Sequence, residues 1–219
     1  MPAEGDVDGL CLILAGGDPA LLPDRIPEPI ALVIAADSGV HLATRLGLAV
    51  DLIVGDLDSA RPEAVDRAER DGAVVERHPT DKDATDLELA LEAAVTRGAR
   101  TAIIVGGTSL DRIDHLLANA ALIAAPRFAG LEIEWWLGAS KVRAARGTLT
   151  LGGAAGDLVS IIPTGGDAEI STAGLRWPLE AALLSQGTTR GVSNEMIGTT
   201  ATISVTAGTA LVVHTRRQP

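Results

Sequence analysis

Apolar residues in the first part of the chain form short continuous runs instead of alternating with polar residues. Five runs share this character: LCLILAG (10–16), ALVIAAD (31–37), DLIVGD (51–56), TAIIVGG (101–107) and LEIEWWLG (131–138). Amphipathic or alanine-rich segments, typical of helices, lie between them at 38–47, 61–71, 84–97 and 112–125. Continuous apolar strands separated by helices indicate a parallel sheet that is buried on both faces. The pattern predicts an α/β domain over residues 1–138, with an open, mostly parallel sheet flanked by helices.

The pattern changes in the segment GASKVRAARG (138–147). The remaining chain is rich in Thr, Gly and Val, and closely spaced turn clusters such as GGAAGD and SQGTTRG interrupt it. Alternating runs such as ATISV and ALVVH lie between these turns. This combination predicts a second, smaller antiparallel β domain over residues 139–219.

The net charge of −11 is unevenly distributed along the chain. Residues 141–219 carry 7 Lys+Arg and 5 Asp+Glu, which leaves 11 Lys+Arg and 24 Asp+Glu, or −13, for residues 1–140. Such an acidic surface repels phosphate backbones, so no nucleic-acid partner is expected. The apolar runs are too short to span a bilayer, and the first residues lack the basic region of a secretory signal. With Cys11 as the single cysteine, we expect a soluble, cytoplasmic protein without an intrachain disulfide.

Acidic residues follow three of the predicted strands. Asp37 ends the second run, Asp56 and Asp58 end or follow the third, and Asp111 and Asp114 follow the fourth. Because ligands of open parallel sheets bind outside the carboxyl ends of the strands, these acids are expected at one edge. Taken alone, GDLDS also fits a simple polar turn.

A further acidic segment is TDKDATDLELALEAA (80–94). Thr85 and Glu88 form a capping-box pattern, which places Asp86 in the first turn of a helix near the positive end of its dipole. These acids can serve the helix cap alone, or they can face the same edge as the strand-end acids.

Several carboxylates at one edge repel one another unless a cation neutralises them, and oxygen ligands suit Mg²⁺. A calcium-binding EF-hand loop starting at Asp56 is excluded, because Ala60 and Arg67 stand where it needs acids. One cysteine and four scattered histidines provide no zinc-ligand spacing. The pattern therefore favours magnesium.

The usual nucleotide-binding fingerprints are absent from the sequence. Neither lysine, Lys82 or Lys141, follows a glycine as a Walker A loop requires, and no two glycines stand one residue apart. A nucleotide would have to be held by metal and a few cations. Lys82 and Arg112, both among the acids, are the candidates for a phosphate clamp, with salt bridges to those acids as the alternative.

Six segments together resemble the thiamine pyrophosphokinase (thiamine diphosphokinase) family. They are AADSG (35–39), VGDLDS (54–59), DKDATDLELAL (81–91), DRIDHLLANAAL (111–122), GLRWPL (174–179) and GVSNEMIG (191–198). They occur in the family's order and span most of the chain. The resemblance implies an α/β domain that binds ATP and magnesium, a β-sandwich domain that binds thiamine, and a homodimer with sites between subunits.

The resemblance also implies an activity, the transfer of the diphosphoryl group of ATP to the hydroxyl of thiamine, which gives thiamine diphosphate and AMP. By motif position, the implied catalytic acids are Asp56, Asp58, Asp86 and Asp114, of which the first three hold the metal. The implied ATP neighbours are Asp37, Lys82, Thr85, Arg112 and His115. Trp177, Ser193 and Asn194 are the thiamine candidates, with a place in the β-domain core as the alternative for Trp177.

Two features depart from the family pattern or stay without a role. Leu110 and Asp111 stand where the family has two glycines, and Trp135 and Trp136 have no functional interpretation. Two other functions stay open at this point. One is transfer of diphosphate to a hydroxymethylpterin, and the other is binding of thiamine or nucleotide without catalysis.

Overall fold

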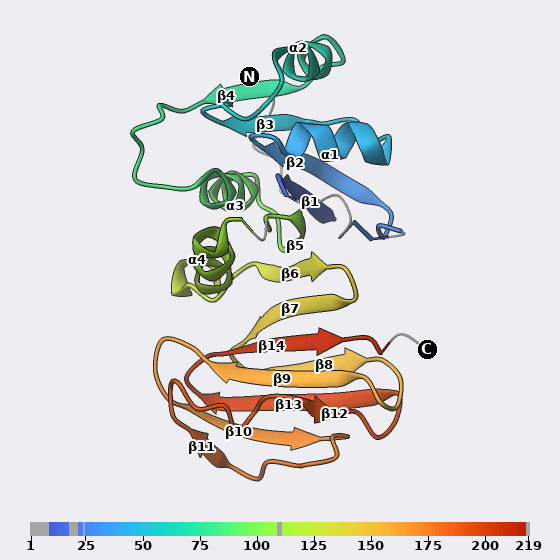
Figure 1. Cartoon of the computed structure of the whole chain (residues 1–219), viewed down its shortest axis with the longest axis vertical. Coiled ribbons are helices and arrows are strands. Elements are labelled where there is room, and N and C mark those ends of the chain that lie inside the picture. The colour runs from blue at the N-terminus through green and yellow to red at the C-terminus, as the bar shows by residue number, and fades with distance from the viewer. Residues whose placement is uncertain (1–8, 18–21, 24, 109–110, 218–219) are drawn as a thin grey trace. The chain divides into compact units, whose positions relative to one another are not determined.

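The computed structural model describes residues 9–17, 22–23, 25–108 and 111–217. Figure 1 shows its helices and strands. The chain divides into two compact units, one made of residues 1–122 and 130–137, the other of residues 123–129 and 138–219. None of the described helices is long and apolar enough to cross a membrane.

The first unit is an α/β unit. Its strands are β1 (Leu10–Ala15), β2 (Ile30–Ala36), β3 (Leu52–Gly55), β4 (Val74–Arg77), β5 (Thr101–Gly106) and β6 (Glu132–Leu137). Its helices are α1 (Gly39–Leu46), α2 (Pro62–Arg70), α3 (Asp86–Thr96) and α4 (Ile113–Ile123). The strands lie in the order β6-β5-β1-β2-β3-β4, and every neighbouring pair is parallel. The prediction of an open parallel sheet with helices is confirmed.

Burial on both faces explains why the central strands read as continuous apolar runs. In β1, Leu12 and Leu14 pack with Leu42 of helix α1 on one face. Their neighbours Cys11 and Ile13 point to the opposite face, because side chains alternate along a strand, and they are also fully buried. A strand with no solvent-facing side can dispense with polar positions.

Strand β4 has no counterpart among the predicted elements. It is four residues long and lies at the edge of the sheet next to β3. None of its residues is fully buried, and Val74 is 53% exposed. A short edge strand of this kind carries little hydrophobic signal, which explains why the sequence pattern misses it.

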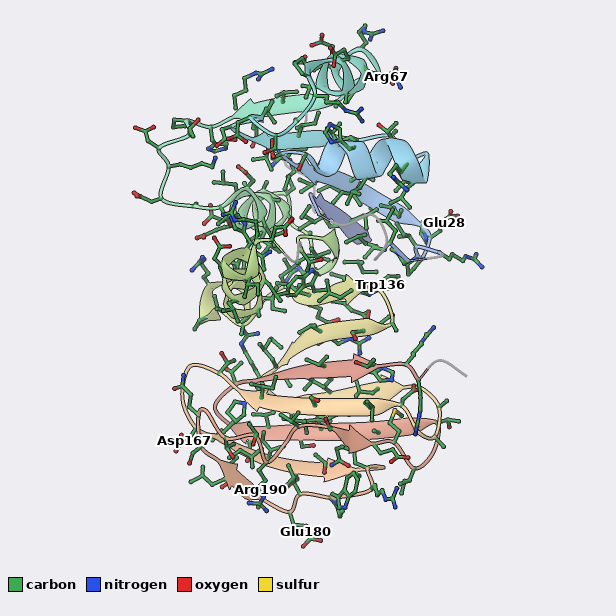
Figure 2. The ribbon with its side chains drawn as sticks, viewed as in Figure 1. Glu28, Arg67, Trp136, Asp167, Glu180 and Arg190 are labelled. Atoms are coloured by element: carbon green, nitrogen blue, oxygen red, sulfur yellow. The ribbon has the colours of Figure 1, made fainter. Side chains whose placement is uncertain are left out.

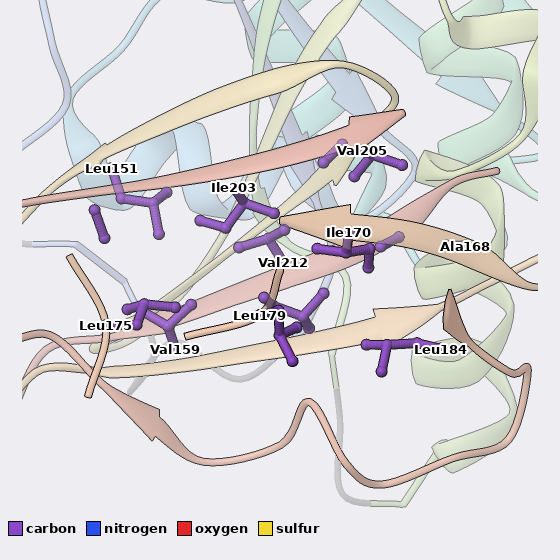
Figure 3. Packing of buried hydrophobic residues seen from close by; sticks show 14 of the residues in the cluster. Leu151, Val159, Ala168, Ile170, Leu175, Leu179, Leu184, Ile203, Val205 and Val212 are labelled. Atoms are coloured by element: carbon purple, nitrogen blue, oxygen red, sulfur yellow. The ribbon is translucent and has the colours of Figure 1, made fainter. Parts of the chain in front are cut away.

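The second unit is an antiparallel β-sandwich, as predicted. Its strands are β7 (Ser140–Ala145), β8 (Thr148–Gly152), β9 (Leu158–Pro163), β10 (Ala168–Ala173), β11 (Ala182–Leu184), β12 (Asn194–Glu195), β13 (Thr200–Ala207) and β14 (Ala210–Thr215). One layer has the order β12-β9-β14-β7 and the other β11-β10-β13-β8. Buried side chains of both layers, including Val159 and Val212 from one and Ile170 and Ile203 from the other, form the core between them (Figure 3).

A buried contact between two polar side chains joins strand β14 to the turn before β9. Asp157 Oδ2 lies 2.9 Å from His214 Nε2, and both residues are buried. The same carboxylate accepts hydrogen bonds from the backbone N–H groups of Ala154 and Arg217. Burial by itself would raise the pKa of Asp157, but these donors and His214 outweigh it and hold the pKa below its usual value.

We expect the Asp157→Asn substitution to lower the free energy of unfolding by about 2 kcal/mol at pH 7. The substitution weakens the buried contact with His214 and the hydrogen bonds that the carboxylate accepts from the backbone. Because the folded pKa of Asp157 is lowered, the carboxylate stabilises the protein above its unfolded pKa of about 3.9. That contribution is lost as the pH falls through the lower folded value. Urea unfolding of wild type and variant should therefore show a difference at pH 7 that shrinks towards pH 3.

The matched control is Glu180→Gln, because the exposed side chain of Glu180 projects outward from the second unit (Figure 2). This control should unfold like the wild type at both pH values. A difference for Asp157→Asn that stays constant between pH 7 and pH 3 would contradict the role given to its charge.

Candidate active site

A cavity of about 400 Å³ lies at the carboxyl ends of the strands in the α/β unit. We call it the acid pocket, because Asp37, Asp56, Asp58 and Asp86 contribute to its wall. The segments after β1, β2, β3 and β5 line it, together with the first turns of α3 and α4. The cavity is adjacent to β1, whose two neighbours β2 and β5 lie on opposite sides. This is the switch point of strand order at which open α/β sheets bind their ligands.

Three carboxylates converge inside the acid pocket. Asp37, Asp56 and Asp58 each offer an oxygen, and these atoms all lie within 4.8 Å of one another. Asp37 is only 8% exposed, and its buried Oδ1 accepts no hydrogen bond from any described residue. Burying a carboxylate oxygen without a hydrogen-bond donor costs free energy unless a cation binds to it. The three side chains are therefore a suitable ligand set for a hard divalent cation.

Unusual backbone geometry brings these acids together. Asp37 has φ of +45° and Leu57, between Asp56 and Asp58, has φ of +64°. Both lie in the left-handed region, which costs free energy for residues other than glycine. Gly55 leaves the space that the carboxylates need, because a Cβ there would lie 2.8 Å from Oδ1 of Asp86. Within the described part of the α/β unit, Asp37 and Leu57 are the two residues other than glycine that adopt positive φ.

Lys82 bridges two of the pocket's acids. Its Nζ lies 2.7 Å from Oδ2 of Asp56 and 3.0 Å from Oδ1 of Asp86. The hydrogen bond from Lys82 is the main cause that lowers the pKa of Asp56. Burial raises the pKa of Asp86 in spite of the same ammonium. Burial also opposes the charge on Lys82, but its two carboxylate partners outweigh this and raise the lysine pKa.

Thr85 begins helix α3 as the sequence pattern predicts. Its Oγ1 accepts a hydrogen bond from the Glu88 N–H at 3.3 Å, and Asp86 occupies the first turn. Thr85 and Asp86 also line the acid pocket. The two readings of this segment are thus compatible, because the same residues cap the helix and face the cavity.

The first turn of α4 contributes Arg112 and His115 to the pocket wall. Arg112 is paired with Asp114 at 3.0 Å, and both side chains are more than half exposed. The hydrogen bond from Arg112 holds the pKa of Asp114 at about 2. Asp114 itself does not belong to the residues that line the pocket. Asp111 is exposed and lies before this turn, whereas Leu110 is outside the described residues.

Two residues without a predicted role shape the loop after β5. The indole N–H of Trp135 donates to the carbonyl oxygen of Gly106 at 2.8 Å, and the amide of Asn119 donates to that of Gly107 at 2.8 Å. Trp135 is 1% exposed, so it positions the loop from inside the unit. Hydrogen bonds from side chain to backbone leave no periodic pattern in a sequence. The only available signal was a tryptophan with a polar atom in a buried strand.

The thiamine candidates lie in the β-sandwich unit. Asn194 is buried, accepts from the Trp177 N–H at 3.1 Å and donates to the Trp177 carbonyl at 2.6 Å. Trp177 is 55% exposed, so it is not a core residue, and the guanidinium of Arg176 lies 5.2 Å from its ring centroid. Ser193 has φ of +61°, and its N–H donates to Ser160 Oγ at 3.0 Å. The structure thus groups all three residues, with Asn194 holding the backbone that presents the Trp177 ring.

Both halves of the chain match family models. Residues 25–135 match the model described as "Thiamin pyrophosphokinase, catalytic domain", and residues 148–210 match "Thiamin pyrophosphokinase, vitamin B1 binding domain". A curated relative from Bacillus subtilis (strain 168), named thiamine pyrophosphokinase, is 27% identical over 207 residues. That alignment covers 92% of this chain and 96% of the relative.

Solved structures agree with these matches. A crystal structure of thiamine pyrophosphokinase from Bacillus subtilis is similar with a TM-score of 0.84 and 26% identity, covering 96% of this chain and all of that one. A thiamin pyrophosphokinase family protein from Enterococcus faecalis gives a TM-score of 0.83 at 25% identity, covering 95% and 99% of the two chains. The order of the six sequence segments, the acid pocket and both family models lead to the same conclusion. The chain belongs to the thiamin pyrophosphokinase family.

Proposed function

We propose that this protein is a magnesium-dependent diphosphokinase that transfers the diphosphoryl group of ATP to the hydroxyl of thiamine, giving thiamine diphosphate and AMP. The observation that carries the proposal is the group formed by Asp37, Asp56 and Asp58 within the part of the chain that matches the catalytic-domain model. The match of the second unit to a vitamin B1 binding domain supports thiamine as acceptor and gives no support to a pterin. A cytoplasmic homodimer is part of the same proposal.

Magnesium is the cofactor that the acid pocket fits best. Asp37, Asp56 and Asp58 would hold it, and it would neutralise charge on the phosphate oxygens as diphosphoryl transfer requires. The family resemblance also implies Asp86 as a ligand. Asp86 is not part of the three-acid group, in which Asp37 stands instead, although Lys82 contacts both Asp56 and Asp86. We propose a different task for Asp86.

The reaction requires the hydroxyl oxygen of the acceptor to attack the β-phosphorus of ATP. A bond forms between these two atoms, the bond from the β-phosphorus to the oxygen bridging it to the α-phosphate breaks, and AMP leaves with that oxygen. Lys82 and Arg112, both in the pocket wall, place positive charge near the phosphate oxygens. The hydroxyl proton needs an acceptor among the chain's own carboxylates.

Asp86 suits the role of proton acceptor better than Asp114. Burial raises the pKa of Asp86, which makes its carboxylate a stronger base, and the residue lines the pocket. Asp114 has a pKa of about 2 and is held by Arg112 outside the pocket wall. We assign to Asp114 the positioning of Arg112, whose guanidinium does reach the wall.

Thiamine carries a cationic ring, and the exposed face of Trp177 offers a surface of the kind that binds cations. Arg176 lies 5.2 Å from the centroid of this ring, a cation–π contact of the kind that a cationic ligand would make. Ser193 lies next to Asn194, the residue that holds the Trp177 backbone. We therefore propose Trp177 and Ser193 as thiamine contacts, with Asn194 positioning Trp177.

The direct test of this function is to incubate the purified protein with ATP and magnesium and either thiamine or a hydroxymethylpterin. We expect AMP and thiamine diphosphate in equal amounts with thiamine and no AMP above background with the pterin. Product formation is followed by separating the nucleotides and thiamine species chromatographically. Binding of thiamine without any AMP would overturn the catalytic assignment in favour of a sensor.

Substitution of Asp58 by Asn tests the metal site. We expect kcat to fall at least about 100-fold, because one negative charge of the three-acid group is lost. The fold should persist, since the Asp58 side chain is exposed and its Oδ1 only accepts from Ser59. Magnesium titration calorimetry should show weaker binding, and the control Asp66→Asn, an exposed acid on α2, should behave as wild type. Near-normal activity of Asp58→Asn would refute the metal role.

A pair of variants separates the roles of Asp86 and Asp114. Asp86→Asn should lower kcat by about 100-fold or more, the usual size of a lost general base. Asp114→Asn should cost less than about 10-fold, because Arg112 keeps its charge and loses only its partner. Steady-state kinetics with saturating thiamine and ATP makes the comparison. A larger loss for Asp114→Asn than for Asp86→Asn would reverse the assignment.

A further inference from the structure

A second cavity, of about 340 Å³, lies beside the acid pocket in the α/β unit. Its wall includes Leu42, His41 and Arg45 of helix α1, and Arg61 before helix α2. We call it the arginine pocket. Gly17 and Ser38 line both cavities, so the two are adjacent. A ligand that passes Ser38 would contact both cavities.

The described charged residues of the arginine pocket are basic, whereas most of those in the acid pocket are acidic. None of the described residues in the wall of the arginine pocket is acidic, although residues 1–140 carry 24 acids against 11 Lys+Arg. Arg45 and Arg61 make no ion pair with any other described residue. Two arginines without an acidic partner among the described residues, in the wall of one cavity, favour a site for an external anion.

The position of Arg61 supports this interpretation. It is the N-cap of helix α2 and its side chain makes no capping hydrogen bond. Ser, Thr, Asp or Asn would stabilise this position, whereas a cation is repelled by the positive end of the helix dipole. A residue that breaks a local rule without a compensating contact is expected where function requires it. A bound anion would supply the missing compensation for Arg61.

His41 connects the two segments that form the arginine pocket, helix α1 and the start of helix α2. Its Nε2 accepts a hydrogen bond from the backbone N–H of Arg61 at 3.0 Å, which ties the start of α2 to helix α1. Burial, reinforced by the charge of Arg61, lowers the pKa of His41. The ring is therefore neutral at neutral pH, and with Nε2 as acceptor its proton is on Nδ1, a further hydrogen-bond donor. The backbone of Arg61 is thus held in place independently of its guanidinium.

We infer that the arginine pocket is a phosphate subsite, in which Arg45 and Arg61 bind a phosphate group of the nucleotide whose other phosphates lie in the acid pocket. The inference rests on the proposed function, because that function supplies the nucleotide. Guanidinium groups match phosphate oxygens in geometry and charge. The apolar side chain of Leu42 and the backbone of Gly17 complete a wall against which the uncharged part of a nucleotide can pack.

The subsite would offset the repulsion between the carboxylates of the acid pocket and the phosphates of a nucleotide. Asp37, Asp56, Asp58 and Asp86 repel a free polyphosphate, and Lys82 is already paired with two of them. A cationic cavity next to these acids gives the nucleotide one favourable contact that does not depend on the metal. AMP, the product without the diphosphoryl group, would then bind mainly through the arginine pocket.

The test uses the double variant Arg45→Gln/Arg61→Gln, with Arg67→Gln as matched control. Arg67 is an exposed arginine whose side chain projects from α2 (Figure 2), and it does not line either cavity. Calorimetry without magnesium or thiamine measures the binding of AMP and, separately, of inorganic phosphate. We expect the double variant to bind AMP at least about 10-fold more weakly than wild type and control, as loss of charged hydrogen bonds implies. The double variant and the control should keep the wild-type melting temperature, because the side chains of Arg45, Arg61 and Arg67 are all exposed.

The phosphate titration distinguishes the source of the anion. If inorganic phosphate displaces AMP from wild type and binds the double variant more weakly, the subsite takes phosphate by itself. If phosphate does not compete while AMP binding still needs both arginines, the subsite belongs to the nucleotide alone. Equal AMP and phosphate binding by wild type and double variant would overturn the inference.

Turnover separates this inference from the proposed function. With ATP, magnesium and thiamine, the double variant should show a KM for ATP raised about 10-fold, with kcat and the KM for thiamine within about twofold of wild type. A wild-type protein that releases no AMP, but whose AMP binding still requires Arg45 and Arg61, would refute the proposed activity and keep the subsite. An unchanged KM for ATP in an active double variant would overturn the subsite and keep the activity.

Discussion

Repulsion between carboxylates at the carboxyl edge of the parallel sheet is the constraint on which this α/β unit depends. Asp56 and Asp86 lie close enough to share the ammonium of Lys82, at 2.7 Å and 3.0 Å. Charges at such distances interact strongly once they are partly removed from water. Lys82 stands just before helix α3, so the ion pairs hold the start of that helix against the end of β3. The same contacts that stabilise the edge therefore also shape the acid pocket.

The remaining charge is held in place by strained backbone. Asp37 and Leu57 both have positive φ, at a cost of about 1–3 kcal/mol each. Asp37 directly follows β2, whose last five residues are buried, and Leu57 lies two residues after the buried strand β3. The hydrogen bonds and packing of these strands determine where the chain leaves the sheet. The packing of the apolar core thus offsets the cost of holding one oxygen of each of the three carboxylates within 4.8 Å of the others.

The sequence predicts those parts of the structure that have a repeating physical cause. Strands buried on both faces leave continuous apolar runs, and the capping pattern of Thr85 and Glu88 places the start of α3 correctly. Contacts that depend on loop geometry leave no such signal. The bond from Trp135 to Gly106 has no counterpart in the sequence pattern. Salt bridges from Lys82 to nearby acids are one of its two interpretations, but the pattern does not say that Asp56 and Asp86 are the partners. The strand-end pattern does predict Asp37 at the same edge as Asp56 and Asp58, but not its φ of +45° or its carboxylate's distance from theirs.

Acidic and basic side chains lie close together along one short segment. Asp37 lines the acid pocket and Arg45, eight residues later, lines the arginine pocket, with Ser38 in the wall of both. Helix α1 begins at Gly39, whose lack of a side chain lets the backbone pack directly on the carbonyl of Leu14 in β1. This close contact packs the start of α1 directly on the central strand, between the residues that line the two pockets. A nucleotide that spans both would meet a preformed pattern of charge, so less of its binding free energy would be spent on ordering the protein.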